Sequence, residues 1–271
     1  MNARVLHACL VLAGAVALAA CTTTTTTTST TVGSSGGPAS SSKDPADAER
    51  RAKVRLELAG MYLGRGQPTT ALDEVTQALA AKPDMPEAYS LRGLIYAALG
   101  DVQRADEDFR RALQLNPRDA GAMHNYGWFL CQQRQFAEAE AQFERALSQP
   151  QYREAVRTLL AQGVCQARAG QWAQAERTLS RSYELDPTNP VTAYNLSEVL
   201  LHRGELERAR FYVRRVNSQP DLSSAQSLWL AARIERRLGD LDAMRDYGRQ
   251  LRDRYPQAPE TLRFEQGRFD D

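Results

Sequence analysis

Residues 86–119 read PEAYSLRGLIYAALGDVQRADEDFRRALQLNPRD, and the pattern in these 34 residues determines the fold. Its first half carries apolar residues at helical spacing up to Gly100, and its second half repeats that pattern up to Pro117. Glycine adopts the left-handed backbone conformation that ends many helices, and proline cannot continue one. The stretch therefore predicts a hairpin of two helices.

The same unit recurs along most of the chain. Its turn residue is Gly66, Gly100, Arg134, Gly170, Gly204 and Gly239, at steps of 34, 34, 36, 34 and 35 residues. Seven positions earlier stands a small residue that would let the two helices approach closely: Ala59, Gly93, Gly127, Gly163, Ser197 and Ala232. We assign six copies, within the region 46–258, to residues 52–85, 86–119, 120–153, 156–189, 190–223 and 225–258.

This unit resembles the tetratricopeptide repeat, a helix-turn-helix of 34 residues. One hairpin cannot bury its apolar face alone, so neighbouring hairpins must stack to form a core. The resemblance implies an all-α fold, a right-handed superhelical solenoid of six repeats. We expect Glu235, which stands where four of the other copies carry an apolar residue, to face water in the last repeat, and residues 259–271 to form a capping segment.

The N-terminus carries a targeting pattern. Arg4 precedes the uncharged apolar run Val5 to Leu18, which has the length of a signal-peptide core and is short for a membrane span. The run ends in Leu18-Ala19-Ala20-Cys21, which resembles the lipobox of bacterial lipoproteins. That resemblance implies a signal peptide over residues 1–20 and acylation of Cys21. The alternative is an ordinary secretory signal with a chance cysteine.

A segment of low complexity follows. Residues 21–45 comprise Cys21 and a Thr-, Ser- and Gly-rich stretch that begins with seven threonines, Thr22 to Thr28. Such a composition cannot bury enough apolar surface to fold, so we expect a flexible tether. Thr22 stands where lipoproteins retained in the inner membrane usually have Asp, which implies the outer membrane, with the chain facing the periplasm. The chain would contact the membrane through the lipid anchor only.

The first helix of each repeat supplies a candidate binding groove. In tetratricopeptide domains, positions 2, 5, 9 and 12 of that helix point to the concave face, and here many of them are apolar or aromatic. Such a groove favours a segment of another protein over a small-molecule substrate. The alternative for Trp128 and Tyr194 is that they fill gaps between helices. The candidate residues are Leu94, His124, Trp128, Leu160, Val164, Tyr194 and Glu198.

Two cysteines remain in the repeats. Cys131 and Cys165 are 34 residues apart, on the first helices of adjacent repeats. Adjacent helices pack closely enough for a disulfide, and the periplasm is oxidising. We therefore predict a bond between Cys131 and Cys165, the alternative being two buried free thiols.

The sequence offers little support for nucleic-acid binding, catalysis or metal binding. The 34 Lys and Arg balance 33 Asp and Glu, whereas a nucleic-acid binder normally has a basic excess. We find no catalytic motif and no cluster with metal-ligand spacing, and His124 and His202 are expected to be groove or surface residues. Asn125 and Asn195 stand where some repeats clamp a carboxylate, but the clamp is incomplete. We predict no enzyme activity, no metal and no cofactor.

The whole combination is similar to the PilF/PilW family of type IV pilus lipoproteins. The resemblance rests on Asn125-Tyr126-Gly127-Trp128-Phe129-Leu130-Cys131, on Phe136-Ala137-Glu138-Ala139 and on Gly163-Val164-Cys165. It implies an outer-membrane lipoprotein that supports pilus assembly or stability, with the pilus secretin or another pilus-assembly protein as partner. Some members are pilotins, which help the secretin to reach the outer membrane and multimerise. The alternative is a general periplasmic scaffold for envelope enzymes.

Overall fold

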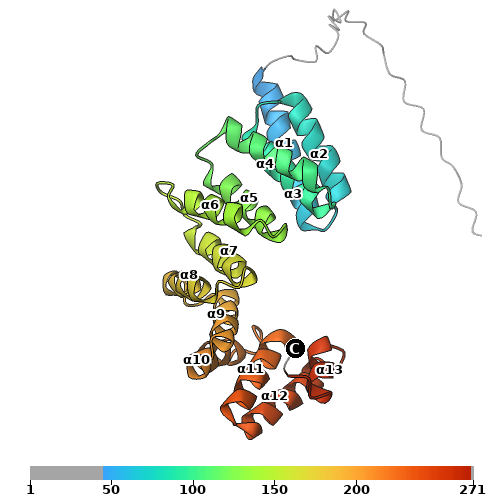
Figure 1. Ribbon diagram of the computed structural model, residues 1–271. Coiled ribbons are helices and arrows are strands. Elements are labelled where there is room, and N and C mark those ends of the chain that lie inside the picture. Colours follow the sequence, from blue (N-terminus) through green and yellow to red (C-terminus); the bar gives the residue numbers. More distant parts are fainter. Residues whose placement is uncertain (1–44, 270–271) are drawn as a thin grey trace, which may run out of the picture. The chain divides into compact units, whose positions relative to one another are not determined.

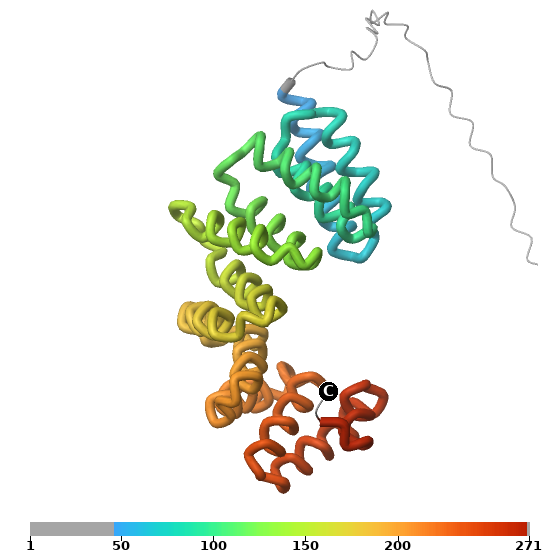
Figure 2. The backbone as a smooth tube through the Cα atoms, in the orientation of Figure 1, coloured from blue at the N-terminus to red at the C-terminus, as the bar shows by residue number. Residues whose placement is uncertain are grey.

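Helical hairpins follow one another along the part of the chain that the structure describes, residues 45–269 (Figures 1 and 2). This structure is a computed structural model, and all described residues belong to one unit of the chain, Lys43–Asp271. Residues 45–269 contain thirteen α-helices and no strand, which confirms the all-α tetratricopeptide superhelix. The helices are α1 (Pro45–Gly64), α2 (Pro68–Ala81), α3 (Pro86–Ala98), α4 (Val102–Leu115), α5 (Ala120–Gln132), α6 (Phe136–Leu147), α7 (Ala155–Arg168), α8 (Trp172–Leu185), α9 (Pro190–His202), α10 (Leu206–Asn217), α11 (Ala225–Leu238), α12 (Leu241–Arg254) and α13 (Pro259–Glu265).

Each odd-numbered helix from α1 to α11 pairs with the next helix, and those from α1 to α9 also contact the hairpin that follows. The turn between the two helices of a pair needs a left-handed backbone. Gly100 has φ 79°, and Arg134 is held at φ 61° in the same place of the third repeat. This conformation suits glycine and strains other residues, so Arg134 occupies a position built for glycine.

Close approach within a hairpin explains the small residues. A Cβ added to Gly127 would lie 3.0 Å from the Phe143 ring, and one added to Gly163 would lie 2.6 Å from Cγ of Leu179. Both partners are buried side chains on the second helix of the same hairpin. The prediction that small residues permit close helix packing is therefore confirmed in the third and fourth repeats.

The core passes from one repeat to the next. The ring of Phe109 on α4 lies 5.5 Å from the ring of Tyr126 and 5.3 Å from that of Phe129, both on α5. On α9, Leu196 and Leu200 belong to a buried cluster that also includes Leu179 of α8. Each hairpin thus completes the apolar core of its neighbour, as stacking requires.

The last hairpin is covered by α13 and the residues after it. Phe264 of α13 packs over Gly248 of α12, and the Phe269 ring lies 4.9 Å from that of Trp229 on α11. Arg236 places its guanidinium 4.4 Å from the centre of the Phe269 ring. The predicted capping segment, residues 259–271, is described as far as Phe269. The predicted signal peptide, Cys21 and the tether up to residue 44 lie outside the described residues.

The expectation that Glu235 faces water is wrong. Its side chain is 1% exposed, and its carboxylate accepts hydrogen bonds from the guanidinium groups of Arg210 and Arg214 on α10. The two arginines of the fifth repeat supply the compensation that a buried carboxylate needs. Within the described residues, no helix is both long and apolar enough to cross a membrane.

Candidate functional site

A groove of about 410 Å³ opens across the first helices of the third, fourth and fifth repeats. Its volume lies in the range of pockets that hold ligands or side chains of a partner. We call it the A-helix groove. Its lining residues are His124 and Trp128 of α5, Arg157, Leu160, Ala161 and Val164 of α7, and Val191 and Asn195 of α9.

Helical spacing places these side chains together. Trp128 follows His124 by four residues, and Val164 follows Leu160 by four, so each pair shares one face of its helix. Because α5 and α7 contact each other, and α7 contacts α9, the three faces form one surface. Val191 is 54% exposed, which leaves its apolar side chain available to a partner.

His124 lies at the bottom of the groove. Its side chain is 5% exposed, and its Nδ1 lies 2.9 Å from Oγ1 of Thr158 on α7. Burial, with a smaller contribution from the positive charge of Arg157, lowers the pKa of His124 from 6.5 to about 4. The imidazole is therefore neutral near pH 7 and links α5 to α7 by a hydrogen bond.

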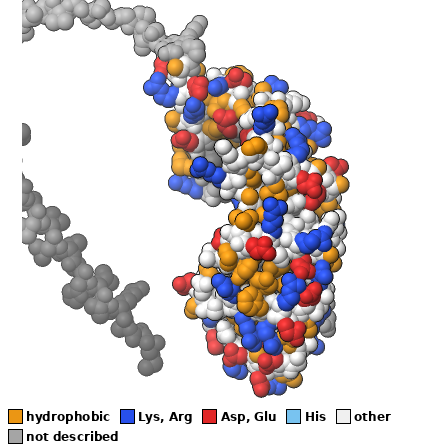
Figure 3. Space-filling view, turned by 90° about the vertical axis from the view of Figure 1, so that its left-hand side faces the viewer, with side chains coloured by type: hydrophobic (Ala, Val, Ile, Leu, Met, Phe, Trp, Pro, Cys, Tyr) orange, Lys and Arg blue, Asp and Glu red, His pale blue; other side chains and the backbone are white. Residues whose placement is uncertain are grey.

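Arginine side chains border the groove. Arg168, at the end of α7, lies over the ring of Trp128 at 5.1 Å, in a cation–π contact. Arg157 pairs with Glu154 at 2.8 Å, and both are exposed. On the face that Figure 3 shows, positive and negative side chains are interspersed, and apolar side chains gather between them.

The two cysteines lie beside the groove and are bonded in the structure. The Cα atoms of Cys131 on α5 and Cys165 on α7 are 5.8 Å apart, within the usual range for a disulfide. Both side chains are buried. The bond ties together the two helices that carry four of the predicted groove residues.

Comparisons with known proteins agree with this architecture. Family models of the tetratricopeptide repeat match residues 86–119, 109–141, 127–190, 166–234 and 226–258. The type IV pilus assembly protein PilF of Pseudomonas aeruginosa is 29% identical over 219 residues, which cover 81% of this chain and 86% of PilF.

Two solved structures resemble the chain over most of its length. The crystal structure of PilW, described as a widely conserved type IV pilus biogenesis factor, has a TM-score of 0.74 and 31% identity, with coverage of 79% of this chain and 97% of PilW. The structure of Pseudomonas aeruginosa pilF has a TM-score of 0.71 and 26% identity, with coverage of 82% and 99%. The chain belongs to the PilF/PilW family. Its repeats are those of tetratricopeptide proteins.

Four of the seven groove candidates meet in the A-helix groove: His124, Trp128, Leu160 and Val164. Glu198 lines a second hollow of about 290 Å³, which adjoins the groove at Val164 and Asn195. The other two candidates pack elsewhere. Leu94 lies one repeat away, against the core around Phe109, and Tyr194 packs against the core around Leu196, where burial raises the pKa of its hydroxyl to about 12.

Two side chains of the second hollow, Arg168 and Trp172, are not among the residues that the sequence singles out. Trp172, at the start of α8, stacks on His202 with ring centres 4.2 Å apart and an angle of 8°. Burial lowers the pKa of His202. Arg168 also lines this hollow. These residues stand at the ends of helices, next to the turn glycines, and a search of the positions that flank each turn could have found them.

The asparagines do not assemble a clamp. Asn125 donates to Oγ of Ser90 at 3.3 Å, and Asn195 donates to the backbone carbonyl of Val191 at 2.8 Å. Each amide is thus engaged within its own chain. Among residues 45–269, no group of three or more His, Cys, Asp or Glu side chains is placed to hold a metal ion.

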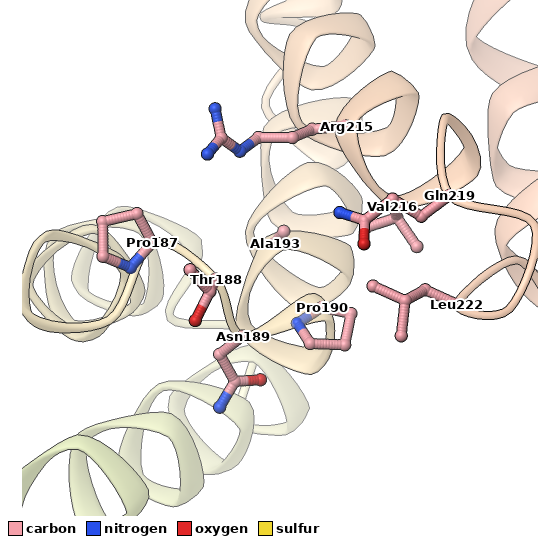
Figure 4. Close-up of a pocket in the computed structure, with 9 residues that line it drawn as sticks. All are labelled: Pro187, Thr188, Asn189, Pro190, Ala193, Arg215, Val216, Gln219 and Leu222. Atoms are coloured by element: carbon pink, nitrogen blue, oxygen red, sulfur yellow. The ribbon is translucent and has the colours of Figure 1, made fainter.

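A further cavity is too small to hold a ligand or a side chain of a partner protein. It measures about 60 Å³ and lies between the turn Pro187–Pro190 and the end of α10. Figure 4 shows the turn residues on one side and Val216, Gln219 and Leu222 on the other. Its volume is well below the ~300 Å³ at which ligand pockets begin. We therefore assign it a packing role.

Proposed function

We propose that this chain is a lipoprotein of the outer membrane that faces the periplasm and promotes type IV pilus assembly by binding a partner protein. The observation that carries the proposal is the likeness to PilW, because the match covers 97% of a protein described as a type IV pilus biogenesis factor. PilF, named as a type IV pilus assembly protein, adds support from sequence.

The A-helix groove supports a binding role. It offers apolar surface from Trp128, Leu160 and Val164, and apolar grooves on repeat proteins suit segments of other proteins. The partner that we propose is the pilus secretin. Binding is non-covalent, and it would hold a segment of the secretin subunit until the ring assembles.

The N-terminal sequence supports the location. Acylation of Cys21 would fix the chain to the inner leaflet of the outer membrane, since several acyl chains anchor more firmly than one. The stretch between Cys21 and α1 would then set how far the groove can reach from the membrane. Together these parts would suit a pilotin, which combines a lipid anchor with a secretin-binding domain.

A charge placed in the groove tests this function. Val191→Asp puts a carboxylate on the exposed rim at the start of α9, and Val102→Asp makes the same change at the start of α4, outside the groove. Each variant should be returned to a strain that lacks the gene, and surface pili and heat-resistant secretin multimers measured. We expect Val102→Asp to restore both and Val191→Asp to restore neither. Normal pili and multimers in the deletion strain itself would refute the pilus role.

A second experiment tests the anchor and the competing scaffold role. Cys21→Ser should leave the fold intact and move the chain out of the outer-membrane fraction. An affinity capture with the full chain should recover the secretin. A capture dominated by peptidoglycan hydrolases, without secretin, would favour the general scaffold instead.

A further inference from the structure

A second and polar hollow lies on the other side of α7, where the third repeat meets the fourth. It measures about 510 Å³ and is bounded by α6, α7 and α8. Helices α6 and α8 each pack on α7, and they make no contact with each other, so α7 forms the floor (Figure 1). We call this hollow the B-helix cleft. Three pairs of residues define it: Glu140 and Glu144, Gln162 and Gln166, and Arg177 and Arg181.

The floor of the B-helix cleft is polar, whereas the same positions of the fifth repeat are apolar. Gln162 and Gln166 are 6% and 4% exposed, and the residues at the same positions of the fifth repeat are Leu196 and Leu200, both fully buried. The leucines fill the space between their helices as part of a core cluster. In the fourth repeat, two amides occupy that place, and an open cleft lies above them.

The hydrogen bonding of the floor is incomplete. Both amides donate to the same oxygen, Oε1 of Glu140, at 2.8 and 2.9 Å. Oε1 of Gln166 accepts no hydrogen bond within the described chain. A buried acceptor without a donor is unfavourable. A small rotation of this amide would let its oxygen accept a hydrogen bond from the N–H group of a ligand, which would remove that cost.

The two rims carry opposite charge. Glu144 on α6 and Arg177 and Arg181 on α8 are exposed, and none of the three forms an ion pair with another described residue. Elsewhere on the surface many arginines are paired, as Arg208 is with Glu176 at 2.7 Å. The cleft therefore presents carboxylates on one wall, guanidinium groups on the other and amides between them.

We propose that the B-helix cleft binds an extended peptide segment of a partner in which basic and acidic side chains alternate. Residues four apart on a helix rise by about 6 Å, and residues two apart on an extended strand are separated by about 7 Å. Side chains of a strand alternate between its two sides, so the basic ones would meet Glu140 and Glu144, and the acidic ones would meet Arg177 and Arg181. Amide side chains both donate and accept, which suits contact with a peptide backbone.

This site is separate from the A-helix groove. The groove uses Leu160 and Val164 of α7, and the cleft uses Gln162 and Gln166 of the same helix. The proposal does not depend on the pilus function, because it rests only on the shape, the amides and the charges of the cleft.

A pair of peptides with equal composition tests the proposal. The probes are acetyl-Lys-Glu-Lys-Glu-Lys-Glu-amide and acetyl-Lys-Lys-Lys-Glu-Glu-Glu-amide, each fluorescently labelled and titrated with the full chain at low salt. Only the alternating peptide can place all bases on one side and all acids on the other. We expect it to bind about ten times more tightly, as several weak ion pairs together would give. Equal affinities for the two peptides would overturn the proposal.

Variants locate the binding. Gln162→Leu with Gln166→Leu copies the fifth repeat and removes the two amides that donate to Glu140, so it should keep the helical content and reduce the preference for the alternating peptide. Arg181→Glu changes an exposed side chain and should weaken the alternating peptide about tenfold without affecting the fold. Val191→Asp, in the A-helix groove, should leave peptide binding unchanged. If the preference survives in both cleft variants, or is lost in Val191→Asp, the site lies elsewhere.

Discussion

Two junctions between neighbouring repeats are held by different interactions around equivalent positions of the repeat. Where the third repeat meets the fourth, a disulfide joins Cys131 to Cys165, and Gln166 donates to Glu140. Where the fifth meets the sixth, Glu235 stands at the position of Gln166 and is held by two arginines, with no covalent bond. One junction thus depends on the redox state of the compartment, and the other on charge. A repeat array with one backbone plan can therefore tune each junction separately.

The largest effect should come from the covalent junction. The double variant Cys131→Ser, Cys165→Ser should lose about 3–4 kcal/mol of unfolding free energy, because the bond closes a loop of roughly 35 residues in the unfolded chain. Denaturant unfolding measures the loss. Hydrogen exchange should rise in α5 and α7 and stay unchanged in α10 and α11. Alkylation of both cysteines in the oxidised wild-type chain would show that the bond is absent.

Acid should weaken the same junction through His124. Its pKa is lowered from 6.5 to about 4, so the unfolded chain takes up a proton at a higher pH than the folded chain. The contribution is fully present above pH 6.5 and falls as the pH drops toward 4, by at most about 3 kcal/mol. Melting temperature against pH measures it. In His124→Gln, the fall in melting temperature between pH 6.5 and pH 4 should be smaller by the contribution of His124. If the fall is the same as in the wild type, another group is responsible.

Glu235→Gln tests the charged junction. The change keeps the shape of the side chain and removes the charge that Arg210 and Arg214 share, so we expect a loss of about 2 kcal/mol. Thermal unfolding of the variant measures it, with Glu265→Gln, on the exposed side of α13, as the control. Added salt should narrow the difference between wild type and variant, since Arg214 is 49% exposed. A gain in stability would mean that the buried charge is unfavourable on balance.

The smallest effect should be a stabilisation at the turn of the third repeat. Arg134 has φ 61°, where the corresponding residues of the other repeats are glycines. Arg134→Gly should relieve strain and raise the unfolding free energy by about 0.5–1 kcal/mol, part of the relief being offset by the entropy of glycine. Arg203→Gly, beside the turn of the fifth repeat, is the matched control and should be neutral or destabilising. Denaturant midpoints compare the two.

The repeat plan was predictable because it depends on single positions. A glycine at a left-handed turn and a small residue at a helix crossing each have a local physical reason, so Gly100, Gly127 and Gly163 could be placed from the sequence. The cysteine pair could be proposed for the same reason, since one repeat length separates the two residues.

The environment of individual polar residues was not predictable, because it depends on side chains far apart in the sequence. Glu235 was expected in water because it stands in the last repeat, and nothing near it in the sequence indicates Arg210 and Arg214. His124 does line the groove as predicted, but its burial and its hydrogen bond with Thr158 of the next repeat could not be predicted from its neighbours in the sequence. Position in the helix did not separate the groove candidates: Leu94 and Tyr194 lie outside the groove, whereas Trp128 and Leu160 line it and pack against the same core clusters.

The contacts of Phe264 and Phe269 have a consequence for how copies of the chain associate. A solenoid that ends on a bare hairpin presents an apolar face to the first hairpin of another copy, and such head-to-tail contacts propagate into filaments. Here α13 and Phe269 cover Gly248 and Trp229 on that face. This face of the last hairpin is therefore covered, which disfavours end-to-end polymerisation of copies through it.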